Sequence, residues 1–155
     1  MSIFDNLDQA TVFENSVYFQ PGTYIVEINA CKFVQGYKGE SFVIESKVLG
    51  VNSDESDAPK VGQIAAQVWN ASGDKREIAR ATWLGFLCAV FQVKKEDYNG
   101  EQWKNISAEV IDDNKLKGMK LFVSVFMKKT KAGGDFTQHR WSVPTQEQLA
   151  EHGVE

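Results

Sequence analysis

A short stretch near the end of the chain, KKTKAGGDFTQHRW (residues 128–141), combines lysines, a two-glycine turn and aromatic residues. Lysines can neutralise the phosphates of a nucleic acid strand, and exposed aromatic rings let bases stack without regard to their sequence. The preceding segment is also basic, because residues 115–131 contain six lysines and no acidic residue. These residue types favour electrostatic and stacking contacts with a strand of nucleic acid.

The lysines also allow a second interpretation. The net charge of the chain is −4 at pH 7, whereas a phosphate-binding protein needs a positive field where the strand lies. Lysines on a solvated strand edge also prevent edge-to-edge pairing of sheets. The acidic residues, however, are concentrated elsewhere, around residues 54–57, 96–101 and 109–113. Charge alone therefore leaves both interpretations open.

The sequence contains no motif that predicts catalysis. There is no G-x-x-x-x-G-K-[ST] phosphate loop, no G-x-S-x-G turn, and no pair of Cys or His residues at metal-ligand spacing. Asp112 and Asp113 could form the metal-binding pair of a nuclease, but adjacent acids in a polar connector are typical of a solvated loop. His139 is predicted to be a surface or hydrogen-bonding residue. We therefore expect a protein that is not an enzyme and binds no metal or cofactor.

Length and composition predict one domain. A chain of 155 residues, 43% of them hydrophobic, can bury a core without a disulfide or a metal. Its longest apolar run, within residues 83–93, is shorter than the roughly 20 residues of a membrane span, and its first residues are acidic where a signal peptide would be basic. We expect a cytoplasmic protein with no membrane contact, in which Cys31 and Cys88 are reduced thiols.

Alternating apolar and polar residues predict five strands. The first two, residues 23–33 and 40–51, flank a glycine-containing loop and form a long hairpin. A shorter third strand covers residues 63–71. The last two, residues 119–128 and 136–143, are joined by the two-glycine turn.

The spacing of apolar residues changes to three and four within residues 75–93, which predicts an amphipathic helix. Asp74 is the expected cap of this helix. Trp83, Phe86 and Phe91 are expected in the core rather than on a binding surface. Residues 94–118 are expected to be irregular, with a helical turn around residues 106–111, and the polar tail is expected to be frayed.

Three strands, a helix and two strands are the element order of the OB-fold, a mainly β, five-stranded, partly open Greek-key barrel. Its ligand face comprises strands two and three and is flanked by the loops that join strands one to two and four to five. In this chain those loops contain Tyr37 and Phe136. The expected organisation is an N-terminal arm (1–20), an OB-fold domain (21–144) and a C-terminal tail (145–155). A second long helix or a parallel sheet would end the OB-fold interpretation.

The strand at residues 119–128 has two different faces. One is an apolar row that should point into the barrel, formed by Met119, Leu121, Val123, Val125 and Met127. The other alternates lysines with Phe122 and Phe126. Exposed phenylalanines on a surface indicate that something covers them, and nucleic acid, the N-terminal arm or a second subunit in a homodimer would all do so.

Trp69 shares one face of the third strand with Gln67, while Ala66 and Val68 share the other. The polar partner predicts that Trp69 points outward, toward the ligand. The complete set of predicted nucleic-acid-binding residues is Tyr37, Lys38, Lys47, Trp69, Lys117, Lys120, Phe122, Phe126, Lys128, Lys129, Lys131, Phe136, Arg140 and Trp141.

The chain resembles the small phage-encoded OB-fold single-stranded DNA-binding proteins of replication and recombination gene clusters. The resemblance covers residues 17–144 and depends on the segments PGTYIVEI, ESFVIESKVL, FLCAVF and GMKLFVSV. It implies binding of single-stranded DNA without sequence specificity, contact with replication or recombination proteins, and a location in the cytoplasm of the host cell. Many family members recruit partners with an acidic tail that ends in an aromatic residue. The tail here has three acids and no aromatic residue, which puts tail-mediated recruitment in question.

Two hypotheses from different classes follow. The first is a single-stranded DNA-binding protein. The second is a structural or protein-interaction protein of a phage, in which the same aromatic residues form a subunit interface and the lysines provide solubility.

Overall fold

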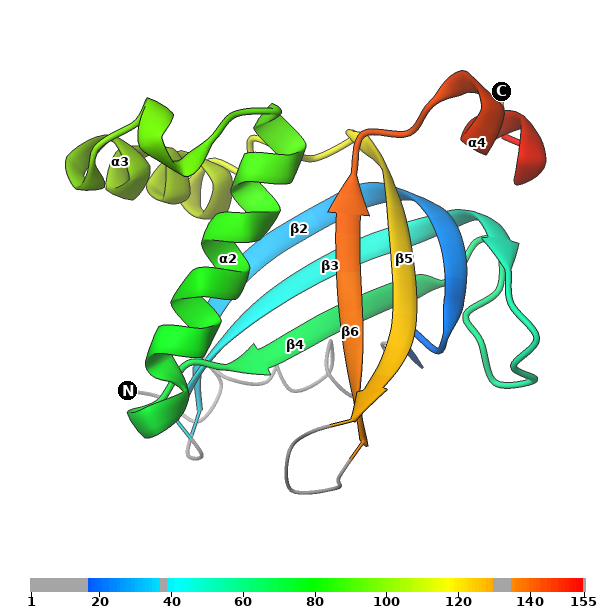
Figure 1. Cartoon of the computed structure of the whole chain (residues 1–155), viewed down its shortest axis with the longest axis horizontal. Helices are drawn as coiled ribbons and strands as arrows, with labels where there is room; N and C mark the ends of the chain where they lie inside the picture. Colours follow the sequence, from blue (N-terminus) through cyan, green and yellow to red (C-terminus); the bar gives the residue numbers. More distant parts are fainter. Residues whose placement is uncertain (1–16, 37–38, 130–134, 155) are drawn as a thin grey trace.

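The computed structural model describes residues 17–36, 39–129 and 135–154, and these form a mainly β structure built on one curled sheet (Figure 1). Its strands, in chain order, are β1 (Val17–Tyr18), β2 (Gly22–Gly36), β3 (Gly39–Asn52), β4 (Ile64–Asn70), β5 (Lys120–Lys129) and β6 (Asp135–Ser142). Their order across the sheet is β1-β4-β3-β2-β5-β6. The sheet curls into a half-barrel, and the prediction of a mainly β structure is confirmed.

The long strand β2 organises the sheet because it pairs on both sides. It runs antiparallel to β3 over almost its whole length, and its first half also runs antiparallel to β5. Two irregularities interrupt the β2–β3 register, at Ile25/Val26 and at Ile28/Ala30. Bulges of this kind increase the local twist and bend the strand. They lie where the sheet turns from β3 and β4 toward β5 and β6.

Each of the five predicted strands overlaps an observed strand, with bounds that differ by at most three residues. The sixth strand, β1, was not expected. It adds a two-residue parallel pairing with Ala65 and Ala66 of β4. The next residue, Phe19, is buried and belongs to the main core.

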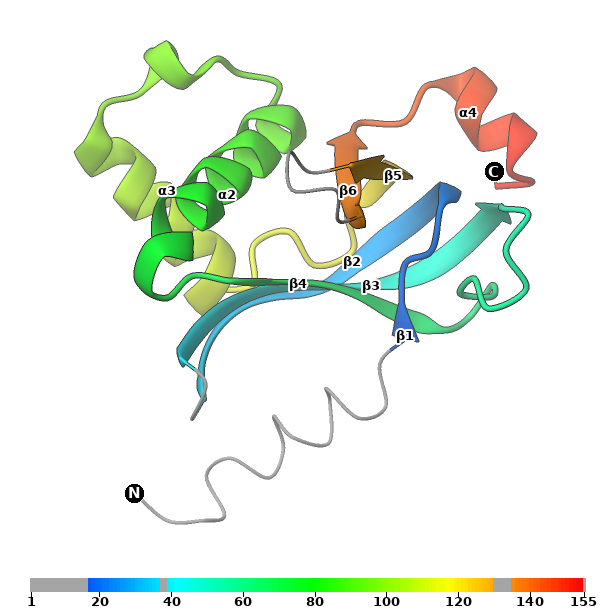
Figure 2. The same cartoon turned by 60° about the horizontal axis from the view of Figure 1, so that its bottom comes forward.

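Helix α2 (Arg76–Phe91) lies across the concave side of the sheet (Figures 1 and 2). Its buried side chains include Trp83, Phe86 and Leu87, whereas Phe91 is half-buried against the same core. The helix begins after a 3-10 turn (Gly73–Lys75). Its N-cap residue is Lys75, whose side chain makes no capping hydrogen bond. The prediction of Asp74 as a capping residue was therefore wrong. Ile78, in the first turn of the helix, is 64% exposed.

A second helix, α3 (Gly100–Asp112), follows a 3-10 turn at Lys95–Asp97. The sequence predicts only a helical turn within this region, so the prediction of an irregular segment was wrong. Asn99 and Gln102 form a capping box, since each side chain accepts a hydrogen bond from the other's backbone N–H. Only Trp103 and Val110 are buried, so the apolar stripe is too narrow to stand out among polar residues.

The C-terminal residues also form a helix, α4 (Gln146–Glu151), capped by Thr145. His152, just beyond it, bonds the hydroxyl of Thr23 at 2.8 Å. The expectation of a frayed tail was wrong because these contacts attach the tail to the sheet.

The main core lies between the concave side of the sheet and α2, with Tyr24, Val26, Ile44 and Leu121 among its fully buried residues. The predicted apolar row of β5 is buried at Leu121, Val123 and Val125, but Met127 at the end of the strand is 52% exposed. Cys31 and Cys88 are free thiols, as expected. Among the residues described, no helix combines the length and apolar character that a membrane span requires.

Candidate nucleic-acid interface

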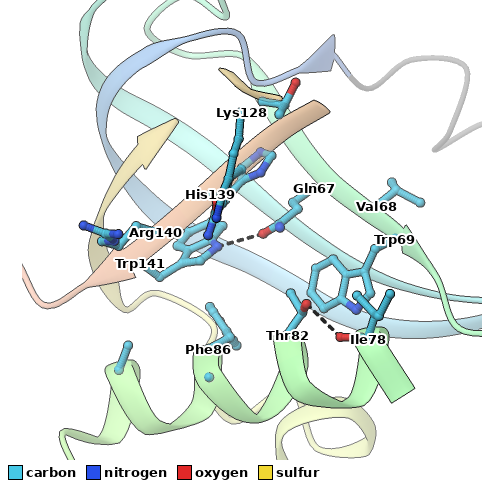
Figure 3. A pocket seen from close by; sticks show the side chains of 14 residues that line it. Gln67, Val68, Trp69, Ile78, Thr82, Phe86, Lys128, His139, Arg140 and Trp141 are labelled. Carbon is cyan, nitrogen blue, oxygen red and sulfur yellow. Dashed lines mark hydrogen bonds between the residues drawn. The ribbon is translucent and has the colours of Figure 1, made fainter. Parts of the chain in front are cut away.

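The half-barrel has an open seam between β4 and β6, because these two strands are not paired in the described residues. A cavity of about 640 Å³ lies along this seam, and we call it the seam cavity. Residues from β4, β6 and α2, together with Lys128 of β5, line it (Figure 3). Cavities of roughly 300–1,000 Å³ are typical of ligand sites.

Side chains rather than a backbone ladder hold the two sides of the seam together. The indole Nε1–H of Trp141 on β6 donates a hydrogen bond to Oε1 of Gln67 on β4, at 2.7 Å (Figure 3). The ring of Phe86 from α2 packs edge-on against Trp141. Phe19, which follows β1, contacts both Trp141 and His139 edge-on from within the core.

Trp69 lies on the concave face of β4, so the predicted outward orientation was wrong. Its indole N–H donates to the carbonyl of Ala79 on α2 at 3.2 Å, and its ring stacks on Phe42 with centroids 5.8 Å apart. Gln67 is buried too, with its carbonyl oxygen satisfied by Trp141. A polar side chain with an internal partner gave a misleading signal. Trp69 nevertheless lines the seam cavity and is only half-buried.

Trp141 is a core residue, although it was predicted to bind nucleic acid. Its side chain is 6% exposed. The ring is held by Phe86, Phe19 and the hydrogen bond to Gln67. Trp141 therefore forms a fixed wall of the seam cavity rather than a platform for an unstacked base.

His139 lines the seam cavity, although it was predicted to lie at the surface or in a hydrogen bond. Neither of its ring nitrogens has a hydrogen-bond partner in the described part of the chain, and both are buried. Burial lowers the pKa of His139 from 6.5 to about 4, because desolvation disfavours the charged imidazolium. At neutral pH its ring offers one unused donor and one unused acceptor.

Three predicted cations lie near the seam. Lys128 and Arg140 line the cavity, and Lys129 is exposed at the end of β5, opposite Asp135. The guanidinium of Arg140 lies over the ring of Phe126 at 5.6 Å from its centroid. This contact covers part of Phe126, so the ring and the cation form one exposed feature beside the cavity.

The remaining predicted lysines lie away from the seam cavity. Lys47 is exposed on β3, opposite Glu27 and Ile64. Lys117 is exposed in the turn that precedes β5. Lys120 is exposed at the start of β5, again opposite Glu27. The structure does not bring these three residues together with Lys128 and Arg140.

Phe122 is covered by the C-terminal segment. Its ring packs edge-on against His152, with centroids 5.7 Å apart. The possible covers expected for this outward ring did not include the C-terminal tail. Four other predicted positions cannot be compared in this way, because Tyr37, Lys38 and Lys131 lie outside the described residues, as does the side chain of Phe136.

The structure reveals a second cavity, of about 900 Å³, between α2 and α3. Its lining includes Phe33, Phe42, Trp83, Tyr98 and Trp103. This cavity was not predicted, because α3 was not predicted. Two aromatic residues within a polar segment, Tyr98 and Trp103, were the available signal.

Within the residues described, no group of three or more His, Cys, Asp or Glu side chains is placed to hold a metal ion. Asp112 lies at the edge of the cavity between α2 and α3, and Asp113 caps the C-terminal end of α3.

No model of a known protein family matches this chain, and no curated protein matches it. The resemblance to phage single-stranded DNA-binding proteins therefore stays a prediction, and the residues and their geometry carry the functional argument.

Proposed function

We propose that this protein binds single-stranded DNA without sequence specificity, and that the seam cavity and its basic rim form part of the interface. One observation carries the proposal. A single cavity has the ring of Trp69, the unpartnered imidazole of His139 and the cations Lys128 and Arg140 among its lining groups. Stacking, hydrogen bonding to a base or phosphate, and neutralisation of phosphates are the three contacts that a single strand offers.

The strand order supports an OB-fold. Without β1, the order is β4-β3-β2-β5-β6, and α2 lies between the third and fourth of these strands in the chain. Helix α3 belongs to the same connection as α2, so it extends that connection without altering any strand pairing. The parallel pairing of β1 with β4 covers two residues and likewise adds to the antiparallel set. Neither feature replaces the five-stranded arrangement.

The position of the seam cavity also supports the proposal. The loop between β5 and β6 follows Lys129, and Lys128 lines the cavity. In OB-folds the corresponding loop, together with strand three, borders the ligand. Here β4 is the third strand, and its residues Gln67, Val68 and Trp69 line the same cavity. The resemblance of the chain to phage proteins extends the proposal to a role in replication or recombination.

Affinity chromatography tests the proposal. The protein should be retained on immobilised single-stranded DNA at about 50 mM salt and should elute as the salt is raised, because counterion release weakens phosphate contacts. Competition with free single-stranded RNA and with duplex DNA then ranks the three ligands. A protein that binds none of the three ligands at low salt would contradict the proposal. It would favour a structural or protein-interaction role for the same surface.

A further inference from the structure

The cavity between α2 and α3, which we call the helix cavity, combines aromatic walls with cations. Its aromatic lining comprises Phe33 from β2, Phe42 from β3, Trp83 from α2, Trp103 from α3, and Tyr98 from the segment before α3. Its volume of about 900 Å³ lies within the range of small-molecule sites. These walls come from two parts of the chain, the β2–β3 hairpin and the region from α2 to α3.

Two tryptophans form rigid walls of the helix cavity. The indole N–H of Trp83 donates to the hydroxyl of Ser107 at 3.0 Å, and that of Trp103 donates to the carbonyl of Lys95 at 3.1 Å. Trp83 also stacks on Phe42, with an interplanar angle of 13°. A preformed wall costs little to order when a ligand binds.

Other aromatic groups at the helix cavity are accessible. Phe33 is 39% exposed and contacts Phe42 at a centroid distance of 4.9 Å. Tyr98 is half-buried and packs edge-on against Trp103. An exposed ring beside a stack of fixed rings is the arrangement on which a planar base can lie.

The charged lining of the helix cavity is mainly positive. Arg80, Lys95 and Lys104 are its cations, and Asp112 is its acid. Arg80 faces Glu77 at 3.5 Å in an exposed pair. No carboxylate in the described residues forms an ion pair with Lys95 or Lys104. These two lysines are available to phosphate.

The helix cavity and the seam cavity lie on either side of α2 and share one row of rings. Phe33 pairs with Phe42 across β2 and β3, and Phe42 pairs with Trp69 across β3 and β4. Phe42 lines the helix cavity, Trp69 lines the seam cavity, and their rings stack at 5.8 Å. One stacked pair of side chains therefore connects the two cavities.

We infer that the helix cavity is a second base-binding site for the same single strand, with a base against Phe33 and Tyr98 and the neighbouring phosphates at Lys95 and Lys104. This inference deepens the proposed function and rests on it. A nucleotide has a planar ring that can contact the aromatic lining and a phosphate that can contact the lysines. The shared aromatic row makes this site continuous with the proposed interface. An acidic peptide with an aromatic residue is the other ligand of matching chemistry, and the experiment separates the two.

Oligonucleotide length provides the test, because OB-folds cover roughly 4–16 nucleotides. Affinities for oligothymidines of about 4 and about 16 nucleotides are measured for the full chain and for Phe33→Ala and Lys95→Gln/Lys104→Gln variants. Loss of one base stack should weaken binding of the long oligonucleotide roughly 5- to 150-fold. The short oligonucleotide should still bind every variant at the seam cavity, with a change below about twofold. Matched controls are Val61→Ala, at another exposed apolar residue, and Lys60→Gln, at an exposed lysine in the loop after β3.

Photo-crosslinking locates the base directly. A long oligonucleotide with 5-iodouracil at successive positions should crosslink to Phe33 or Tyr98, as identified by peptide mass spectrometry. If the full chain binds no oligonucleotide, the proposed function itself fails. If it binds the long oligonucleotide but the helix-cavity variants bind equally well and no crosslink reaches residues 33 or 98, the inference is overturned and the cavity is left to a peptide.

Discussion

The Nε1–H of Trp141 and the Oε1 of Gln67 form a buried hydrogen bond of 2.7 Å across the seam between β6 and β4. The two residues are 74 positions apart in the sequence, and in the described residues their strands share no backbone ladder. Each polar group satisfies the other at a buried position.

Replacement of Gln67 by leucine should destabilise the fold. The change leaves the buried indole N–H of Trp141 without an acceptor, which costs about 1–3 kcal/mol. Urea denaturation should show a lower midpoint with an unchanged m value. Gln35→Leu is the matched control, because Gln35 makes an exposed hydrogen bond, and its effect should stay within about 0.5 kcal/mol. Equal stabilities of the two variants would contradict the role assigned to Gln67.

Trp69→Ala should affect both folding and binding. The half-buried ring packs on Phe42 and α2, so its loss should lower the free energy of unfolding by about 2–3 kcal/mol, less than the ~3–5 kcal/mol typical of a fully buried tryptophan. Binding of single-stranded DNA, measured per folded molecule, should weaken by about 1–3 kcal/mol. Val90→Ala is the comparison, because Val90 is buried in the core and lines neither cavity, so its binding per folded molecule should stay unchanged. If Trp69→Ala leaves the binding per folded molecule unchanged, Trp69 is not part of the interface.

The salt dependence of binding should report the phosphate contacts of the seam. If about four to six cations meet phosphates, log affinity against log salt should have a slope of about −3 to −4, at ~0.7 per contact. Neutralising Lys128, Lys129 and Arg140 together with glutamine should reduce the magnitude of that slope by about 2. Neutralising Lys60, Lys75 and Arg76, all exposed outside the seam cavity, should leave it unchanged. A slope near zero for the wild type would mean that the lysines make no phosphate contacts and serve solubility.

Acid should destabilise the protein through His139. Its pKa is about 4 in the folded protein and 6.5 ordinarily, so between these values the unfolded state binds more protons and stability rises with pH. Stability should therefore fall as the pH drops from about 6.5 to 4, by at most about 3.4 kcal/mol at 1.36 kcal/mol per unit of pKa. His139→Gln should flatten this part of the profile in thermal melts at successive pH values. An identical acid limb in the variant would show that another group is responsible.

Gly50→Ala should detach the C-terminal segment. A Cβ at Gly50 would lie 2.5 Å from the carbonyl oxygen of His152, and this close contact with backbone can be relieved only by movement of the segment. The cost should be about 1–3 kcal/mol, together with faster proteolysis after β6. Gly85→Ala is the control, since a Cβ there has open space and alanine favours the helix. A tail that stays as resistant to protease as in the wild type would contradict the packing described.

The strands of this fold could be predicted from the sequence because their alternation reflects burial on one side. The alternation did not reveal which side of β4 faces inward, because Gln67 and Trp69 satisfy their polar groups internally. Helix α3 escaped prediction because its two buried residues lie among polar neighbours.

The structure brings together only some of the residues that the sequence predicted for the candidate site. Lys128 and Arg140 do line a cavity with Trp69, yet Trp141 proved to be a wall and Phe122 is covered by the tail. Burial and tail packing depend on contacts between distant segments, which spacing along one strand does not encode. Residues of α3 form one wall of the helix cavity. Because α3 was not predicted, the cavity could not be predicted either.

Because the seam is unpaired, the shape and charge of the proposed interface can change without a change in the strand pairing of the sheet. A ladder between β4 and β6 would fix their separation through the peptide backbone, whereas here side chains set the spacing across the seam cavity. Substitutions at the positions that line it can therefore widen, narrow or recharge the site while the register of every strand stays the same.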